Sequence, residues 1–333
     1  MLSSPPRRRQ RVLLLGATGT IGLATAAALM VRGHEVVCFL RPRPNGDLLP
    51  HQRAVLKDAT LRWGDPGDPI SLRQQGIAGE TFDAVVSCMA SRTGLPEDAW
   101  RIDHDAHLTL LEASKEAGIP HFVLLSALCV QKPRLAFQHA KLAFEKKLIE
   151  SGLGFSIVRP TAFFKSLSGQ WARVKKGKPF LIFGDGRLTA CKPISDADLG
   201  HFMASCLEDP DRQNGLFPIG GPGPAITPLE QGQALFSALG LQPRFKKVPV
   251  GLMDFLIGVL SGVGKVWPAA AAKAELARIG RYYATESMLV WDAHRHRYDA
   301  QATPSYGTQT LFDAYAKWGQ GDGPPALGDH AVF

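Results

Sequence analysis

Three glycines near the start of the chain stand at a spacing that suits a bound nucleotide. Gly16, Gly19 and Gly22 follow the apolar run 12–15 and precede the alanine-rich segment 23–31. In a loop between a strand and a helix, the first glycine permits a sharp turn and the next lets a pyrophosphate approach the backbone, while the last allows close helix packing. The N–H groups at the helix start then face the phosphates. We predict a dinucleotide site here, rather than a loop that serves packing alone, and it also includes Thr18, Thr20 and Ile21.

A basic residue, Arg41, follows the predicted strand 35–40, where a site for NAD usually carries Asp or Glu. A carboxylate at this point binds the ribose hydroxyls, whereas a guanidinium accommodates a 2′-phosphate. The residue type therefore favours NADPH, with Arg43 as a second contact, over a solvated loop arginine. Asp65, after the third predicted strand, either faces the adenine end or caps the turn that follows it.

The elements that must position these residues alternate between strand and helix through the first half of the chain. Besides the helix that ends near Gly33, helices are expected at 99–117 and 137–150. The strands are short continuous apolar runs, which is typical of a parallel sheet covered by helices on both faces. This pattern predicts an α/β fold with a doubly wound parallel sheet of the Rossmann type. The expected strands are 11–15, 35–40, 60–63, 83–87, 121–126 and 154–158.

The rhythm changes in the second half, which predicts a smaller C-terminal substrate lobe. Such a lobe would cover the carboxyl ends of the strands, where ligands of these sheets bind. We therefore divide the chain into an NADPH-binding domain, 11–160, and a lobe, 161–320, some of whose elements return to the main sheet. Within 177–196 we expect extended segments around a hairpin-type turn at Gly184-Asp185-Gly186.

The segment from Val248 to Gly264 is apolar enough to raise the question of a membrane. It carries one charge, Asp254, and lies between Lys247 and Lys265. A spanning helix needs about 20 apolar residues, so the segment falls short. A buried helix or a ligand lid is the preferred interpretation, and a helix at a membrane interface is the alternative.

Charge and composition exclude several classes of function. The net charge of +8 would suit nucleic acid, a membrane surface or an anionic ligand, but the chain has no arrayed basic motif for nucleic acid. Its five cysteines include no CxxC pair and indicate thiols in a reducing compartment. The histidine pairs at 104/107 and 294/296 lack further ligands, so no protein-bound metal is expected.

Taken in order, these marks resemble the extended, atypical short-chain dehydrogenase/reductase family. They are the glycine loop, Gly64-Asp65 after the third strand, Ser126 after the fifth, Lys141, and Arg159-Pro160-Thr161 after the sixth. The resemblance implies that the lysine holds the nicotinamide ribose and that Pro160 lies by the nicotinamide. Ser126, and Ser87 at the end of the fourth strand, are then expected beside the cofactor.

One departure from that family bears on the chemistry. The Tyr-x-x-x-Lys motif reads Phe137-Gln138-His139-Ala140-Lys141 here. Phenylalanine cannot move a proton to or from a carbonyl oxygen. Three options remain open: another acid such as His139, reduction of a C=C bond, or no catalysis.

Longer runs resemble the divinyl chlorophyllide 8-vinyl reductases. The resemblance covers roughly residues 11–318 and implies NADPH-dependent reduction of one vinyl group on divinyl chlorophyllide or protochlorophyllide, a magnesium tetrapyrrole of chlorophyll or bacteriochlorophyll synthesis. The start of the chain close to the first strand favours a bacterial form in the cytoplasm, beside the photosynthetic membrane. The runs are 124–133, 137–141, 159–170, 184–196 and 282–290.

Aromatic residues near the nicotinamide segment are candidates for stacking on a flat ring. Phe137, Phe163, Phe164 and Trp171 are the substrate candidates, against ordinary core packing, and Lys165 is one of several cations that could hold a carboxylate. Two other functions compete with the reductase: a non-catalytic NADPH-binding regulatory or assembly protein, and an isoflavone-reductase-like enzyme on a small phenolic.

Overall fold

A seven-stranded parallel sheet forms the body of the molecule. The computed structural model describes residues 8–42, 48–321 and 323–325. The strand order is β3-β2-β1-β4-β5-β6-β8, which confirms the predicted doubly wound sheet of the Rossmann type. The strands are β1 (Arg11–Leu15), β2 (Glu35–Leu40), β3 (Thr60–Trp63), β4 (Ala84–Ser87), β5 (His121–Leu125), β6 (Gly154–Pro160) and β8 (Gly215–Ile219).

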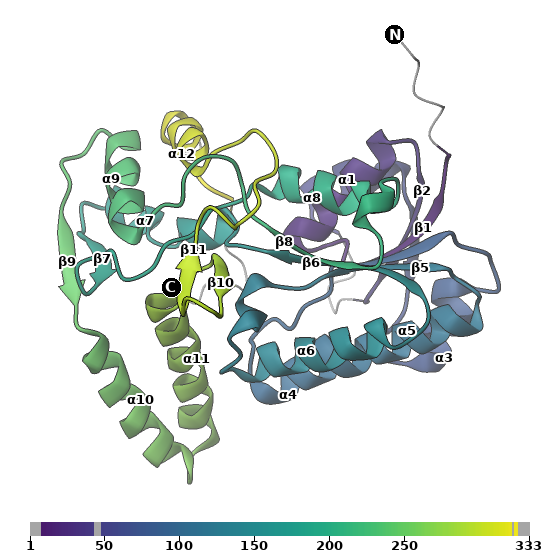
Figure 1. Cartoon of the computed structure of the whole chain (residues 1–333), viewed down its shortest axis with the longest axis horizontal. Helices are drawn as coiled ribbons and strands as arrows, with labels where there is room; N and C mark the ends of the chain where they lie inside the picture. The colour runs from purple at the N-terminus through teal and green to yellow at the C-terminus, as the bar shows by residue number, and fades with distance from the viewer. Residues whose placement is uncertain (1–7, 43–47, 322, 326–333) are drawn as a thin grey trace.

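Helices cover both faces of this sheet (Figure 1). Side chains of β1 alternate between the two cores, with Val12 and Leu14 on one face and Leu13 and Leu15 on the other, all fully buried. One face carries α1 (Thr20–Val31) and α8 (Asp196–Ser205). The other carries α3 (Pro69–Ser71), η2 (Leu72–Ile77), α4 (Pro96–Ala99), η3 (Trp100–Ala106), α5 (His107–Glu116) and α6 (Ala136–Ile149).

Two elements from beyond residue 160 belong to this body. β8 pairs with β6, and α8 packs so closely on α1 that a Cβ on Gly200 would lie 2.6 Å from the Ala24 carbonyl carbon. The short connecting elements are α2 (Pro50–Val55), η1 (Leu56–Asp58), η4 (Leu128–Gln131), η5 (Lys165–Ser168) and η6 (Pro210–Arg212).

A smaller lobe with its own core lies beside the body. Its apolar centre contains Trp171, Phe180, Phe236 and Tyr315. Thr227 accepts a hydrogen bond from the Glu230 amide and caps one of its helices. Its elements are α7 (Trp171–Lys175), β7 (Phe180–Phe183), α9 (Pro228–Ala238), β9 (Phe245–Val248) and α12 (Leu311–Gln320), with a small hairpin of β10 (Val290–Asp292) and β11 (Arg297–Asp299).

The prediction of a hairpin around Gly184-Asp185-Gly186 is wrong. β7 pairs in parallel with β9 instead, starting with a hydrogen bond of 2.8 Å from the Phe180 amide to the Arg244 carbonyl. The turn itself is present, and Gly184 and Gly186 have positive φ. However, the Gly186 carbonyl accepts from the Leu229 amide, so the turn leads toward α9 rather than back along β7.

The prediction of a buried helix or a ligand lid for the apolar segment Val248 to Gly264 is wrong. α10 (Val250–Gly264) has every residue at least partly exposed and packs on α11 (Pro268–Thr285), with which it projects from the body (Figure 1). None of its residues lines the cleft described below. In the part of the chain that the structure describes, no helix combines the length and apolarity needed to cross a membrane.

We expect Gly22→Ala to damage the body at a crowded point in the first turn of α1. A Cβ there would lie 2.0 Å from the Gly16 carbonyl oxygen, so α1 must shift, and the free energy of unfolding should fall by about 1–3 kcal/mol. The matched control is Gly258→Ala on α10, where a Cβ meets nothing within 4 Å. Urea unfolding should show a neutral or stabilising change of up to about 1 kcal/mol for the control. Equal changes in the free energy of unfolding for the two variants would show that crowding at Gly22 does not destabilise the fold.

Candidate functional site

A cleft of about 1940 Å³ lies at the carboxyl ends of the main sheet and extends under the lobe. Its lining comes from the loops after β1, β2, β4, β5 and β6, together with α11. This is the place where ligands of doubly wound sheets bind. Of the residues predicted for the site, it is lined by Gly16, Thr18, Gly19, Thr20, Ile21, Gly22, Arg41, Phe137, Lys141, Pro160 and Phe163.

The glycine loop forms a cradle that side chains would fill. Gly16 has a φ of +78°, and a Cβ on it would lie 2.6 Å from the Cys88 carbonyl carbon in the loop after β4. The N-cap of α1 is Gly19, whose lack of a side chain leaves no cap bond, and the first turn carries no acidic residue. The amides at this helix start are therefore open to an anion, which fits the pyrophosphate of a dinucleotide.

A cation stands beside this helix start. The Lys165 Nζ donates a 3.0 Å hydrogen bond to the Thr20 hydroxyl, although the two residues lie 145 positions apart. Asp196, at the start of α8, is close enough for its charge to interact with Lys165. Burial raises the pKa of Asp196 to about 6, and the Lys165 charge opposes that rise. The sequence made Lys165 one of several cations that could hold a substrate carboxylate, whereas the structure places its ammonium beside the start of α1.

The end of the cleft that would hold the adenosine is more open. Arg41 is exposed after β2 and lines the cleft, while Arg43 lies outside the described residues. Asp65 does not line the cleft. Its Oδ1 accepts a 2.9 Å hydrogen bond from the Gly67 amide, so the alternative of a turn cap is the one observed.

A buried ion pair forms the floor at the middle of the cleft. The Lys141 Nζ lies 2.9 Å from Oδ1 of Asp103, whose side chain is fully buried. The Ser91 amide and hydroxyl also donate to this carboxylate, at 3.2 and 2.6 Å. Asp103 lies in η3, a π-helical turn, which is a distortion often found at functional sites. The carboxylate thus fixes the lysine of α6 and the loop after β4 in one arrangement.

A neutral histidine supports this floor from below. His107 Nδ1 donates to the Ile102 carbonyl at 2.8 Å, so its Nε2, 2.9 Å from the Ser87 hydroxyl, accepts. Burial, with the nearby Lys141 charge, lowers the pKa of His107 to about 4. Ser87 is therefore engaged behind the cleft wall and does not line it.

The Ser126 hydroxyl also has a hydrogen-bond partner outside the cleft. Its hydroxyl donates to Glu145, which also pairs with Arg159, and the serine does not line the cleft. The geometry gives no support for Ser87 or Ser126 as direct cofactor contacts. Both hydroxyls instead satisfy buried polar partners in the body.

The far end of the cleft is apolar. Phe137 lines it, and a Cβ on Gly94 would meet Phe137 at 3.6 Å and Ile279 of α11 at 3.0 Å, so these side chains converge. Phe137 and Ile279 belong to one apolar cluster with Cys129 and Met288. A phenylalanine thus faces the cleft where the related family carries tyrosine.

Three predicted residues are found away from this end. His139 is exposed on α6 and does not line the cleft, because the helix turns it toward solvent while Lys141 faces inward. Phe164 and Trp171 are buried in the core of the lobe, where Trp171 packs on Tyr315 and Trp318. The geometry therefore does not support His139 as an acid, or Phe164 and Trp171 as direct substrate contacts.

Sequence reasoning missed Tyr283, which is the only tyrosine among the described residues that lines the cleft. It is 36% exposed overall, but its hydroxyl lies 3.9 Å from the buried sulfur of Cys129. Burial, followed by the neighbouring Cys129, raises the pKa of Tyr283 well above its ordinary value, so the phenol stays protonated. The sequence feature that could have pointed to Tyr283 is its place in the run 282–290, one of the runs that carry the family resemblance.

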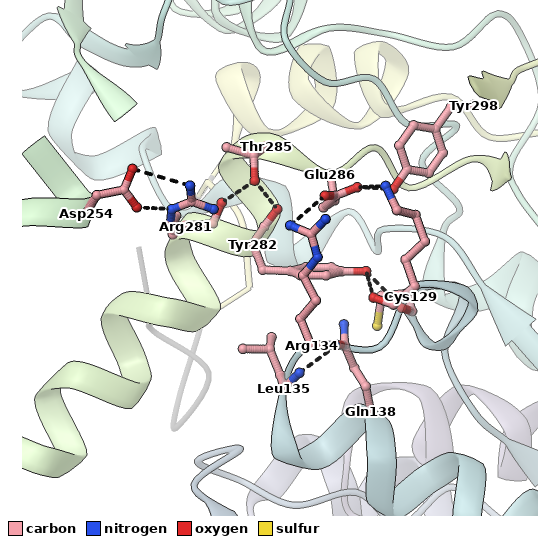
Figure 2. A network of polar contacts seen from close by, with 11 residues as sticks. Cys129, Arg134, Leu135, Gln138, Asp254, Arg281, Tyr282, Thr285, Glu286 and Tyr298 are labelled. Atoms are coloured by element: carbon pink, nitrogen blue, oxygen red, sulfur yellow. Dashed lines mark hydrogen bonds and ion pairs between the residues drawn. The ribbon is translucent and has the colours of Figure 1, made fainter. Parts of the chain in front are cut away.

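A polar network anchors α11, which carries Tyr283, to the body (Figure 2). The Tyr282 hydroxyl donates to the carbonyls of Cys129 and Lys132, at 2.9 and 3.1 Å. Glu286 accepts from Lys132 at 2.7 Å and from Tyr298, and Arg134 lies 3.1 Å away. Burial raises the pKa of Glu286, but these partners outweigh it and hold the pKa below its ordinary value. The wall formed by α11 is therefore fixed relative to the floor.

Comparison with known proteins identifies relatives over nearly the whole chain. Residues 16–210 match an NAD(P)H-binding family. Divinyl chlorophyllide a 8-vinyl-reductase of Cucumis sativus is 48% identical, with 97% of this chain and 79% of the relative covered. The Arabidopsis thaliana protein of the same name is 47% identical, with 92% and 76% covered. Leucoanthocyanidin reductase from Vitis vinifera, 16% identical, shares the fold with a TM-score of 0.66 over 93% of this chain and all of that structure.

We expect Arg41→Ala to separate the two nicotinamide cofactors. A guanidinium can bind a 2′-phosphate through two parallel hydrogen bonds, so the variant should bind NADPH more weakly by about 1.5–3 kcal/mol and NADH almost as before. Arg53→Ala is the control, since this exposed arginine of α2 does not line the cleft. Fluorescence titration with both cofactors measures the effect. An equal loss for NADPH and NADH would show that Arg41 does not read the phosphate.

Proposed function

The chain belongs to the divinyl chlorophyllide a 8-vinyl-reductase family, and we propose that it reduces the 8-vinyl group of divinyl chlorophyllide or protochlorophyllide to ethyl with NADPH. The observation that carries the proposal is the pairing of a dinucleotide cradle with an apolar cleft end where Phe137 faces inward. A reaction at a carbonyl or hydroxyl uses an acid at the position that Phe137 occupies, whereas reduction of a C=C bond can take its proton from another group.

The residues that line the cleft support a binding mode for the whole length of NADPH. We propose that the loop Gly16–Gly22 and Lys165 hold the pyrophosphate, that Arg41 binds the 2′-phosphate, and that Lys141 holds the nicotinamide ribose with Pro160 nearby. When bound, NADPH supplies a hydride to the vinyl carbon. The charge of Lys141 is available at the cleft because Asp103 holds its ammonium there. This pair acts by positioning, since its own groups are already hydrogen-bonded.

The apolar end suits a flat, hydrophobic ring. Phe137, Phe163 and Ile279 line it and would exclude water from the reacting carbons. The vinyl group is conjugated with the macrocycle, so negative charge that develops on the carbon framework is spread over the ring. The task of the protein is therefore orientation and water exclusion rather than stabilisation of an oxyanion.

The second hydrogen must arrive as a proton. The Tyr283 hydroxyl is the protonated acid at the same end of the cleft as Phe137, and it lies beside Cys129 of the same apolar cluster. We propose that Tyr283 Oη delivers this proton, in place of the tyrosine that the related family carries on α6. The phenolate then regains a proton from solvent before the next turnover.

The direct test mixes the purified protein with NADPH and divinyl chlorophyllide. Reduction of the vinyl group shifts the Soret absorption of the pigment, and NADPH is consumed in equal amount. A non-catalytic NADPH-binding protein would bind the cofactor without either change. An enzyme for a small phenolic would leave the pigment unchanged and consume NADPH only with its own substrate.

The cellular setting stays a prediction. A bacterial cytoplasm, a role that includes bacteriochlorophyll synthesis, and contact with the photosynthetic membrane were expected from the sequence. The curated relatives named above are chloroplastic. Both settings are compatible with a substrate that is a tetrapyrrole of chlorophyll synthesis.

We expect Lys141→Met to lose activity through misplacement of the nicotinamide. A displacement of about 1 Å can reduce a rate about 100-fold. The measurement is a single turnover at saturating NADPH, where a rate that stays low at every pH indicates positioning. Lys147→Met, at an exposed lysine of the same helix, is the matched control.

Removal of Lys141 also leaves the buried Asp103 without its counter-charge, which destabilises the fold. The double variant Lys141→Met/Asp103→Asn relieves that charge and should melt closer to the wild type while remaining slow. Wild-type single-turnover rates in either variant, with only cofactor binding weakened, would contradict a positioning role.

We expect Tyr283→Phe to slow vinyl reduction by about 10- to 100-fold, since a positioned acid contributes about that much or more. Affinity for NADPH should not change. Tyr306→Phe is the control, because Tyr306 packs on Phe202 and does not line the cleft. If kcat for Tyr283→Phe stays within about twofold of wild type, solvent supplies the proton directly.

A further inference from the structure

α10 presents a continuous apolar stripe to solvent. Leu252, Phe255, Leu256, Val259 and Val263 recur every three or four residues, which places them on one face of the helix. Each of them is between 42% and 66% exposed. Single exposed apolar residues are ordinary, but a contiguous patch of this kind marks an interaction surface.

The face of α10 opposite the stripe packs on α11, and this packing fixes how the stripe is oriented. Asp254 pairs with Arg281 of α11 (Figure 2). Arg278 of the same helix donates to the Ser261 hydroxyl at 2.7 Å. Near the turn the two helices pack closely, because a Cβ on Gly264 would lie 2.9 Å from the Ala271 Cα. The stripe therefore lies on the face of α10 opposite α11. The two helices project together from the body of the molecule (Figure 1).

The charges around the stripe are positive. Lys246 and Lys247 precede α10, Lys265 follows it, and all three are exposed. The single acidic residue of the helix, Asp254, is paired with Arg281. The turn to α11 adds Trp267, which is 62% exposed, to the apolar surface. Tryptophan and lysine beside an apolar helix face are typical of elements that lie in the interface of a membrane.

We propose that α10 and the turn that follows it, residues 250–267, dock on a bilayer surface that carries anionic headgroups. The apolar stripe enters the boundary between headgroups and acyl chains, and the flanking lysines contact the headgroups. A second copy of the chain fits the surface less well. Two copies joined through the stripe about a twofold axis would bring lysines of both chains together at its ends.

Docking of this kind connects the bilayer to the cleft through α11. Pro268 begins α11 at the docked turn, and Ile279 and Tyr283 of the same helix line the apolar end of the cleft. Ile279 lies about 17 Å along the helix from Pro268. This step rests on the proposed function: docking would hold the apolar end of the cleft close to the bilayer into which an apolar pigment partitions.

The test is flotation of the full chain with vesicles, without pigment or NADPH. We expect binding to vesicles of phosphatidylcholine with phosphatidylglycerol, weaker binding without phosphatidylglycerol, and loss at high salt. Phe255→Ser should lower the affinity about tenfold, as expected when a buried aromatic ring is removed. The control is Ile70→Ser, since Ile70 of α3 is 62% exposed and lies outside α10 and α11.

The charge contribution has its own variant, Lys247→Glu/Lys265→Glu, which should abolish the preference for phosphatidylglycerol. Wild type that stays unbound, or Phe255→Ser that floats like wild type, would overturn the proposal. A dimer that Phe255→Ser dissociates, with no vesicle binding, would assign the stripe to a second copy. NADPH binding checks that each variant is folded. Reduction of pigment in detergent by Phe255→Ser should equal that of wild type, so failure of docking and failure of the reductase are distinguishable.

Discussion

The buried ion pair between Lys141 and Asp103 is the interaction on which the site depends. Both groups lose most of their hydration, so each is stable only with the other in place. The carboxylate also receives two hydrogen bonds from Ser91, and it thereby joins α6 to the loop after β4 at the cleft floor. Neutral His107 below the pair adds no competing charge. One fixed cation thus stands at the middle of the cleft, with the phosphate cradle on one side and an apolar end on the other.

α11 gives the molecule its second organising constraint. It forms a wall of the apolar end, it carries Tyr283, and it is the packing partner of α10. The contacts of Tyr282 and Glu286 with the segment 129–134 hold this helix against the body. The proposed lipid surface on α10 and a wall of the apolar cleft end on α11 therefore belong to two helices that pack on each other.

Much of the body follows from local sequence signals, and much of the site does not. Continuous apolar runs and the glycine spacing predict the main strands and the cradle, because both depend on neighbouring residues. The parallel pairing of β7 with β9 joins segments about 65 residues apart, which no turn signal reveals. Phe163 lines the cleft while adjacent Phe164 is buried in the lobe, a difference of one residue that composition cannot resolve. Lys165 reaches Thr20, and Tyr283 reaches Cys129, only through tertiary packing.

In the proposed reaction, one hydrogen of the new ethyl group comes from the cofactor and the other from an exchangeable acid in the cleft. The most direct measurement is mass spectrometry of the pigment after turnover with NADPH that carries deuterium at the transferred position of C4. We expect one cofactor deuterium per ethyl group in ordinary water, and one solvent deuterium when unlabelled NADPH is used in D2O. A product without cofactor deuterium would contradict direct hydride transfer in this cleft. Two solvent deuterons in one ethyl group would contradict it as well.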